Sequence, residues 1–461
     1  MDLALLRLDM ITALGLNKHG QAQWLYTAHL LPDNPEGKQV MILEPEQVGQ
    51  SQVDVRGLIR SLEEEWGRKI SSKRINSQEE RAILVSVTTQ SRTTAQESMK
   101  ELEELARSAG IEILETTFQF RKEISPKFLM GKDRLSSLSI RALQLGATLL
   151  VFDQDLNPSQ VASLTDFTDL KVIDRTQLIL DIFAQRARTR EGRLQVEMAQ
   201  LKYVLPRLKG RDDALSRLSG GIGGRGPGET RLEIDRRRVR EKINRLQKEL
   251  DTLRTQRRQR RGKRNRRELP VISIVGYTNA GKSTFLNSLT HSRLSAEDRY
   301  FATLDPTSRR LRLPKEREVI ITDTVGFIEN LPRDLLTAFR ATLEELEDAD
   351  LLLHVVDVSN PLFEKHLTVV EDLLKELELL HIPLLRVFNK VDLVSKEYAR
   401  TQCLRYRAIP VCALEEKTFG EFLEVIDKFL MGQIPQESLP LQHRKEEHTL
   451  FCPFPKGISR T

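Results

Sequence analysis

Residues 271–284 read VISIVGYTNAGKST, in which a β-branched apolar run precedes Gly276, four residues, Gly281, Lys282 and Ser283. This is the GxxxxGK[ST] pattern in the strand–loop–helix context that it requires. The glycines let backbone N–H groups curl around a phosphate, the lysine bridges the β- and γ-phosphates, and the serine hydroxyl is a Mg²⁺ ligand at a helix N-terminus. The stretch therefore predicts an α/β domain with a phosphate-binding loop.

Two further motifs follow, each after an apolar run typical of a strand. DTVG (323–326) places Asp323 where a carboxylate holds Mg²⁺ through water, and the N–H of Gly326 can meet the γ-phosphate. NKVD (389–392) ends in Asp392, whose carboxylate can accept hydrogen bonds from guanine N1–H and the 2-amino group, donors that adenine lacks. The nucleotide is therefore predicted to be GTP rather than ATP.

The segment FATLDPTSRR (301–310) lies between these motifs and is the natural place for a switch that orders around the γ-phosphate. Thr303 is the candidate second Mg²⁺ ligand beside Ser283 and Asp323, with Thr307 as the competing choice. Backbone N–H groups of the CAL tripeptide (412–414) can reach guanine O6. The predicted catalytic residues are Lys282, Thr303, Gly326 and Asn279, and the predicted nucleotide contacts are Gly276, Tyr277, Thr278, Asn279, Ala280, Gly281, Lys282, Ser283, Thr284, Phe301, Ala302, Thr303, Leu304, Asp305, Asp323, Thr324, Val325, Gly326, Asn389, Lys390, Val391, Asp392, Cys412, Ala413 and Leu414.

Length and composition narrow the class of protein. The chain has 461 residues, enough for about three domains, and its 39% hydrophobic and 30% charged residues fit an ordinary soluble globular protein. No apolar run reaches the ~18 residues that a membrane-spanning helix needs, and the start does not read as a signal peptide. The three cysteines form no CxxC pair, which argues against a disulfide framework and favours a reducing, cytoplasmic setting.

Positive charge is concentrated in one segment. The net charge is +6, yet residues 235–267 hold 16 Lys/Arg against 4 Asp/Glu, so the rest of the chain is acidic overall. Such a run is either a solvated helix face or a contact with the phosphate backbone of a nucleic acid. Its density in an otherwise acidic chain favours nucleic acid.

Periodicity predicts a parallel sheet and then a helical hairpin. Residues 81–180 alternate apolar runs with helical stretches, which is the βαβ rhythm. Between two helices lies SGGIGGRGPGET (219–230), whose six glycines predict a mobile tip. The two helices show heptad spacing, at Leu194, Met198, Leu201, Leu205 and Leu208 and at Val239, Ile243, Leu246, Leu250 and Leu253. The hairpin is either a plain antiparallel coiled coil that joins two domains or, as the arginines around its tip favour, a functional arm. A hairpin closed on itself favours a monomer.

The expected fold class is therefore α/β, with an N-terminal parallel α/β domain, a long antiparallel helical hairpin and a P-loop GTPase domain built on a mostly parallel sheet with helices on both faces. The expected boundaries are 1–80 for an N-terminal extension, 81–180 for the α/β domain, 181–268 for the hairpin and basic linker, 269–432 for the GTPase domain and 433–461 for a short tail.

The motifs GYTNAGKST, FATLDPTSRR, DTVGF and NKVD, with GGIGGRGPGET and RLEIDRRRVRE upstream, resemble the HflX family of ribosome-associated GTPases over about residues 81–432. The resemblance implies GTP hydrolysis that is slow alone and stimulated by ribosomes. It also implies binding to the large ribosomal subunit and its RNA rather than to DNA, and a role in splitting or rescuing stalled ribosomes. The hairpin tip would then approach the peptidyl transferase region.

The chain departs from this family in three places. KFLMGKD keeps only Gly131 and Lys132 of a glycine-rich turn common in the N-terminal domain, which then either binds a second nucleotide or holds an ordinary turn. Residues 1–80 resemble the later part of an extension found in longer members. The segment after Met431 is shorter than the small C-terminal domain of many members.

Two residues bear on catalysis. Phe327 follows DTVG, where Ras-like enzymes place a glutamine that orients the attacking water, so another group, from the backbone or the ribosome, is expected to order it. Asn279 is similar to the P-loop asparagine of GTPases that bind potassium in place of an arginine finger; alternatively it caps the loop. Two functions follow: a GTPase that splits or rescues ribosomes, or a GTP-switched RNA-binding or ribosome-assembly protein without splitting activity.

Overall fold

The computed structural model describes residues 10–32, 34, 38–49, 54–72, 80–168, 170–208, 231–264, 269–290, 300–301, 307–329 and 346–432. The chain splits into two compact units. One comprises Met1–Leu178 and Pro206–Leu232, and the other comprises Ile179–Leu205 and Glu233–Thr461. The glycine-rich tip (219–230) and the tail (433–461) lie outside the described residues.

The first unit begins with a small antiparallel sheet that the sequence analysis did not predict. It contains β1 (Met10–Leu16), β2 (Ala22–Leu30), β3 (Val40–Ile42) and β4 (Glu46–Gln47), and both β3 and β4 pair with β2. Helix α2 (Val55–Ser72) follows. Apolar side chains remain exposed on these strands, such as Leu14 at 59% and Ile42 at 74%. Because neither face is consistently buried, the strands lack the clean alternation from which a half-buried strand is predicted.

The predicted parallel sheet is confirmed in the same unit. Its order is β6-β5-β7-β8, and the elements alternate along the chain as β5 (Arg81–Thr88), α3 (Arg92–Ser108), β6 (Glu112–Phe120), α4 (Lys132–Leu145), β7 (Leu149–Phe152), α5 (Pro158–Phe167) and β8 (Lys171–Asp174). Strand β5 is buried after its first residue, as expected for a parallel strand covered on both faces.

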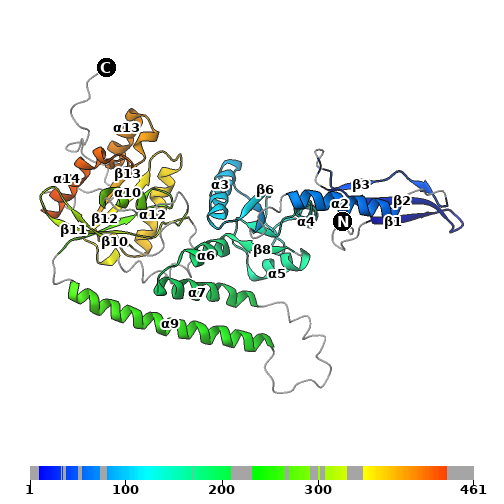
Figure 1. Cartoon of the computed structure of the whole chain (residues 1–461), viewed down its shortest axis with the longest axis horizontal. Helices are drawn as coiled ribbons and strands as arrows, with labels where there is room; N and C mark the ends of the chain where they lie inside the picture. Colours follow the sequence, from blue (N-terminus) through cyan, green and yellow to red (C-terminus); the bar gives the residue numbers. More distant parts are fainter. Residues whose placement is uncertain are drawn as a thin grey trace. The chain divides into compact units, whose positions relative to one another are not determined.

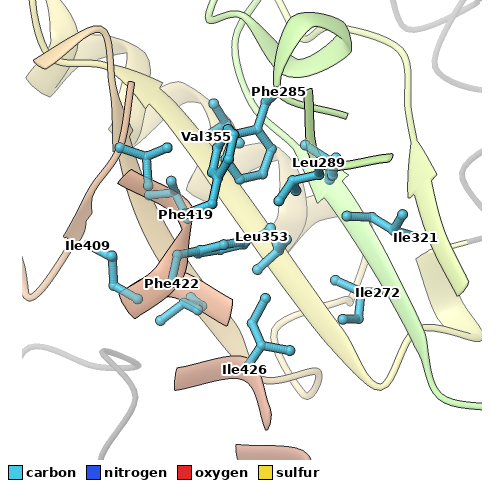
Figure 2. Packing of buried hydrophobic residues seen from close by; sticks show 14 of the residues in the cluster. Ile272, Phe285, Leu289, Ile321, Leu353, Val355, Ile409, Phe419, Phe422 and Ile426 are labelled. Atoms are coloured by element: carbon cyan, nitrogen blue, oxygen red, sulfur yellow. The ribbon is translucent and has the colours of Figure 1, made fainter. Parts of the chain in front are cut away.

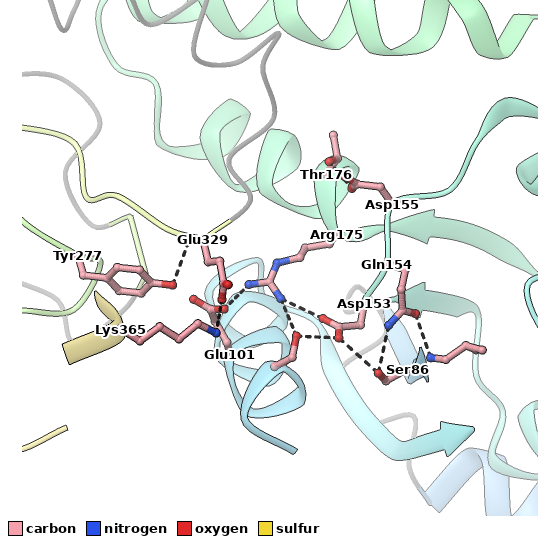
Figure 3. A network of polar contacts seen from close by, with 12 residues as sticks. Ser86, Glu101, Asp153, Gln154, Asp155, Arg175, Thr176, Tyr277, Glu329 and Lys365 are labelled. Carbon is pink, nitrogen blue, oxygen red and sulfur yellow. Dashed lines mark hydrogen bonds and ion pairs between the residues drawn. The ribbon is translucent and has the colours of Figure 1, made fainter. Parts of the chain in front are cut away.

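A buried ionic network lies at the carboxyl ends of these strands (Figure 3). Arg175 donates to Asp153 at 2.9 Å and pairs with Glu101, and the Asp153 carboxylate accepts from Ser98 at 2.8 Å. The side chains of Arg175 and Asp153 are both buried. Removing Arg175 would leave the buried Asp153 carboxylate without its cation, which is strongly destabilising.

The helical hairpin is antiparallel, as predicted. Its helices are α7 (Arg190–Val204) and α9 (Arg231–Arg264), and α6 (Arg175–Arg186) precedes them (Figure 1). Glu197 pairs with Lys242 at 2.6 Å and Arg190 with Glu249 at 3.5 Å, so the partner number falls as the number in α7 rises. On α9 the seam residues Leu246 and Leu250 are buried. With 34 residues, α9 extends for about 51 Å.

The second unit contains a six-stranded sheet in the order β10-β11-β9-β12-β13-β14, in which only the β10–β11 pair is antiparallel. This arrangement confirms the predicted α/β fold class. The strands are β9 (Val271–Val275), β10 (Thr307–Arg312), β11 (Glu318–Asp323), β12 (Leu351–Asp357), β13 (Leu384–Asn389) and β14 (Ile409–Pro410).

Helices cover both faces of this sheet. Phe285 of α10 (Lys282–Thr290) and Phe422 of α14 (Phe419–Leu430) pack with Leu353 and Val355 on one face (Figure 2). The Phe285 and Phe422 rings meet edge to face at 5.2 Å between centroids, a favoured aromatic geometry. The other face packs under α12 (Phe363–Glu376) and α13 (Lys396–Tyr406). The sheet is therefore held rigidly between two helical layers.

Candidate nucleotide-binding site

The carboxyl ends of the parallel strands meet at one edge of the sheet, and the predicted motifs begin there. The P-loop (residues 276–283) follows β9, DTVG lies at the end of β11, and NKVD begins at the end of β13. In open parallel sheets this edge is where ligands bind, next to the strand at which the order reverses. Strand β9 is that strand here, because its successors lie on opposite sides of it.

Two glycines allow the P-loop to pack closely. A Cβ atom added to Gly276 would lie 2.3 Å from the carbonyl oxygen of Val355, and φ is +156°. A Cβ atom added to Gly281, where φ is +87°, would lie 2.4 Å from Nδ2 of Asn389. Because neither neighbour can be approached so closely, only glycine fits at either position.

Lys282 is buried beneath the loop. Its Nζ donates to the carbonyl oxygen of Tyr277 at 2.8 Å. Burial lowers the pKa of Lys282 from 10.5 to about 8, and the Asp323 carboxylate opposes that shift. The lysine is thus restrained by the loop's own backbone while its charge lacks full solvation.

A hydroxyl and a carboxylate meet where the sequence places Mg²⁺. Ser283 Oγ donates to Asp323 Oδ2 at 2.6 Å, and Asp323 is buried at the end of β11. Oxygen ligands of this kind suit Mg²⁺, which usually takes one or two protein oxygens together with substrate phosphates. Among the described residues no group of three or more His, Cys, Asp or Glu has a metal-binding arrangement, and a nucleotide-bound Mg²⁺ does not require one.

The DTVGF segment (323–327) is hydrogen-bonded directly to the P-loop. Thr278 N–H donates to the carbonyl oxygen of Phe327 at 2.7 Å, and Phe327 N–H donates to that of Gly276 at 3.1 Å. Thr324 Oγ1 donates to the carbonyl oxygen of Ile274 at 2.6 Å. The backbone between these bonds is therefore placed against the loop.

Gly326 lies within this bonded segment. A Cβ atom there would lie 2.9 Å from Cγ2 of Thr278 and 3.0 Å from Nζ of Lys282, so glycine lets the backbone approach the lysine. The neighbouring Phe327 is only 3% exposed. Its ring is packed into the protein and offers no group that hydrogen-bonds water.

Asn389 connects three parts of the site. Its Nδ2 donates to the carbonyl oxygen of Ala280 in the P-loop at 2.9 Å, and its Oδ1 accepts from Ala413 N–H at 2.9 Å. The asparagine is buried, and both ends of its amide are satisfied. It thereby fixes the P-loop and the CAL segment relative to β13.

Lys390 also holds the P-loop, and it pairs with an aspartate, Asp357, that the sequence analysis missed. Its Nζ donates to the carbonyl oxygen of Asn279 at 3.1 Å and pairs with Asp357 at 2.8 Å. Both Lys390 and Asn279 have left-handed backbones, with φ of 61° and 60°. Asp357 ends the apolar run LLLHVVD, just as Asp323 ends EVIITD, and that parallel is the signal that could have identified it.

The predicted guanine-recognition residues are near one another. Burial, followed by a hydrogen bond to Asp392, raises the pKa of the Cys412 thiol, which places the two side chains together. Asp392 lies exposed in a short 3-10 turn (Val391–Leu393), and Leu414 is 79% exposed. An exposed carboxylate can receive the edge of a base, and an exposed apolar side chain can receive its face.

The switch segment is described only in part. Ala302, Thr303, Leu304 and Asp305 lie outside the described residues, so the structure does not test Thr303 as a metal ligand. The competing Thr307 is the first residue of β10, opposite Asp323 in the strand register.

Phe301, which the sequence analysis predicts to contact the nucleotide, is buried. Its ring packs against Phe183 of α6 within the second unit, at 4.5 Å between centroids. A small pocket borders the P-loop, and the sequence analysis assigned no role to its other lining residues. These are Tyr300, His354, Val355, Val356, Asp357, Asn360 and His366.

Comparisons with known families agree with this site. Residues 271–390 match the family model of a 50S ribosome-binding GTPase. Residues 96–184 match a model of the N-terminal part of a GTP-binding GTPase, and residues 186–264 match its middle region. The three matches occur in the order in which the motifs lie along the chain.

The family of this chain is shown by its similarity to curated relatives. A GTPase HflX from Caldanaerobacter subterraneus is 49% identical over 316 residues, which is 68% of this chain and 73% of that protein. The GTPase HflX of Escherichia coli is 45% identical over 348 residues, or 75% and 82%. The chain belongs to the HflX family of GTPases. A GDP-bound GTP-binding protein from Sulfolobus solfataricus is 23% identical, with a TM-score of 0.43 over 77% of this chain and 100% of that one.

As an HflX GTPase, this chain binds GTP and hydrolyses it to GDP and phosphate. The prediction that the nucleotide is GTP is confirmed at the level of the family. Among the described residues, no helix is long and apolar enough to cross a membrane.

Proposed function

We propose that this HflX GTPase binds the large ribosomal subunit and its RNA through the helical hairpin, and that it splits or rescues stalled ribosomes. The observation that supports this proposal most is helix α9, whose 34 residues carry exposed cations such as Arg238 and Arg245. Phosphate backbones attract such a surface, and a rigid pair of helices can carry the glycine-rich segment into a narrow RNA cleft.

The proposed domain roles follow the predicted boundaries. The extension (1–80) and the α/β domain (81–180) precede the hairpin and basic linker (181–268). The GTPase domain (269–432) then holds the nucleotide, and the tail (433–461) follows. We assign no second nucleotide to the α/β domain, because Gly131 caps α4 without the glycine-rich turn of other members.

At the nucleotide, we infer that Lys282 holds the β- and γ-phosphates and that Gly326 N–H meets the γ-phosphate. Asp392 reads the guanine edge, and the Cys412–Leu414 backbone reaches O6. Ser283, Thr303 and Asp323 would hold Mg²⁺, with Asp323 acting through water. The ion would neutralise the charge that develops on the phosphate oxygens.

Buried Phe327 supports slow hydrolysis in the free protein, because it cannot orient water. A ribosomal or backbone group would supply that function. Asn279 would help to hold K⁺ beside the phosphates, where a cation stabilises the transition state. GTP would order the switch and favour the ribosome-bound state, and hydrolysis would release the protein.

The experiment that tests this function is GTP turnover with and without large ribosomal subunits, in K⁺ and in Na⁺. We expect subunits to raise turnover at least ~10-fold and deletion of residues 220–228 to abolish that rise without affecting basal turnover. Equal turnover in K⁺ and Na⁺ would remove the potassium role. Absence of any stimulation would contradict the ribosomal trigger.

A GTP-switched RNA-binding or ribosome-assembly protein remains the second candidate, since the cations of α9 would serve it equally. Sedimentation of ribosomes with the GTP-bound protein separates the two. Conversion of whole ribosomes into subunits supports splitting. Tight, salt-sensitive RNA binding with an unchanged subunit distribution supports the alternative.

A further inference from the structure

The side chain of Tyr277, the second residue of the P-loop, points away from the phosphate-binding groups. Its ring stacks on His366 of α12, with 3.8 Å between centroids and 5° between planes. Its hydroxyl accepts the backbone N–H of Glu329 at 3.0 Å. One P-loop side chain therefore contacts both α12 and the segment that follows DTVGF.

An ion pair also connects the two segments that Tyr277 contacts. The Glu329 carboxylate pairs with Lys365 Nζ at 2.6 Å, and Lys365 directly precedes His366 in the first turn of α12 (Figure 3). We call Tyr277, Glu329, Lys365 and His366 the tyrosine clamp. It joins the P-loop, the segment after DTVGF and α12, and Tyr277 is only 4% exposed within it.

The clamp restrains the backbone on the far side of Gly326. Before Gly326, Thr324 Oγ1 donates to the carbonyl oxygen of Ile274 in β9 at 2.6 Å, and directly after Gly326, Phe327 N–H donates to the carbonyl oxygen of Gly276 at 3.1 Å. On the far side, Glu329 N–H is held by the Tyr277 hydroxyl. A peptide held at both ends keeps its N–H groups pre-oriented, which avoids reorganisation when charge develops on a substrate oxygen.

We propose that Tyr277 is a positioning residue for GTP hydrolysis, which acts by holding the backbone after DTVGF so that the Gly326 N–H faces the γ-phosphate. This inference rests on the proposed role of Gly326. The P-loop groups that bind the phosphates are backbone N–H groups and Lys282, and Lys282 uses only the carbonyl oxygen of Tyr277. Loss of the tyrosine hydroxyl should therefore affect the rate of hydrolysis and not the affinity for nucleotide.

Tyr277→Phe tests the proposal, because it removes the hydroxyl and keeps the ring stacked on His366. In single-turnover assays without ribosomes, we expect hydrolysis of bound GTP to slow by about 3- to 10-fold, the value of one hydrogen bond. The Kd values for GDP and for a non-hydrolysable GTP analogue should stay within about 2-fold. Hydrogen exchange at the Glu329 amide should become faster, which reports the lost bond directly.

Three further variants provide one control and two independent tests. Tyr398→Phe makes the same chemical change at an exposed tyrosine of α13 and should leave the rate unchanged. His366→Ala removes the stack and should slow hydrolysis, and combined with Tyr277→Phe its effect should be less than additive because both act through one clamp. Gly326→Ala should hydrolyse GTP slowly if Gly326 serves the γ-phosphate.

Each outcome decides a separate point. Hydrolysis at the wild-type rate or faster in Tyr277→Phe would overturn the positioning role, as would a loss of GDP affinity in proportion to the loss of rate. Wild-type hydrolysis in Gly326→Ala would instead overturn the proposed role of Gly326. Neither result depends on whether ribosomes stimulate the enzyme.

Discussion

Lys282 shows how burial shapes the chemistry of one residue. In the free protein its pKa is lowered to about 8, chiefly because the ammonium group is desolvated. A bound polyphosphate favours the charged form and raises the pKa again. Binding of GTP must therefore take up a proton wherever the free lysine is neutral, and affinity should fall as pH rises through about 8.

We predict that GTP affinity weakens by about 5-fold between pH 7 and about 8.7, the fall expected for a free-state pKa near 8. Calorimetric or fluorescence titration across this range measures it. Guanosine, which has no phosphates, is the control and should bind with constant affinity. A constant Kd for GTP, or an equal loss for guanosine, would show that the Lys282 charge does not control binding.

Among the elements, β12 carries a buried histidine at the centre of the sheet. His354 is 1% exposed, and its Nδ1 has no hydrogen-bond partner. Burial, together with the charges of Arg386 and Lys282, lowers its pKa from 6.5 to about 3. The folded protein therefore binds fewer protons here than the unfolded chain below pH 6.5, and stability falls as pH falls.

At pH 5, protonation of this histidine in the unfolded chain lowers the free energy of unfolding by about 2 kcal/mol relative to a pH well above 6.5. We expect His354→Leu, which keeps an apolar side chain of similar size in β12, to reduce the loss of stability between pH 7 and pH 5 by about that amount. Urea unfolding of nucleotide-free protein at the two pH values is the measurement. His381→Leu, at an exposed histidine, is the matched control. An unchanged pH dependence in His354→Leu would mean that the histidine charges in the folded state.

For the whole molecule, the uneven distribution of charge governs association. The cations gathered in 235–267 outweigh the acidity of the rest of the chain. If α9 tracks phosphates on the large subunit, each contact releases counterions, and affinity falls steeply with salt.

Replacement of two exposed cations of α9, Arg240→Gln with Lys248→Gln, should weaken subunit binding and reduce the slope of log affinity against log salt by about 1 to 2. Binding measured between about 50 and 200 mM KCl tests this. The control, Lys396→Gln with Lys417→Gln, removes the same charge from exposed positions of the GTPase domain. Equal effects of the two double variants would indicate attraction by net charge alone.

The sequence alone determined the order of motifs, the α/β class, the choice of GTP and the hairpin. Each depends on chemistry or periodicity within a short stretch: the P-loop glycines lie within 276–281, and the α9 seam repeats within one helix. The same local patterns missed the small sheet β1–β4, whose strands bury neither face consistently. They also gave no sign that the ring of Phe301 packs against Phe183 of α6.

Only the tertiary structure decided how the site is held together. Asn389 binds a P-loop carbonyl 109 residues away, and Lys390 binds one 111 residues away. The stack of Tyr277 on His366 likewise depends on where α12 begins relative to β9. No local pattern contains these contacts, because they arise when the order of strands brings the carboxyl ends of β9, β11, β12 and β13 to one edge of the sheet.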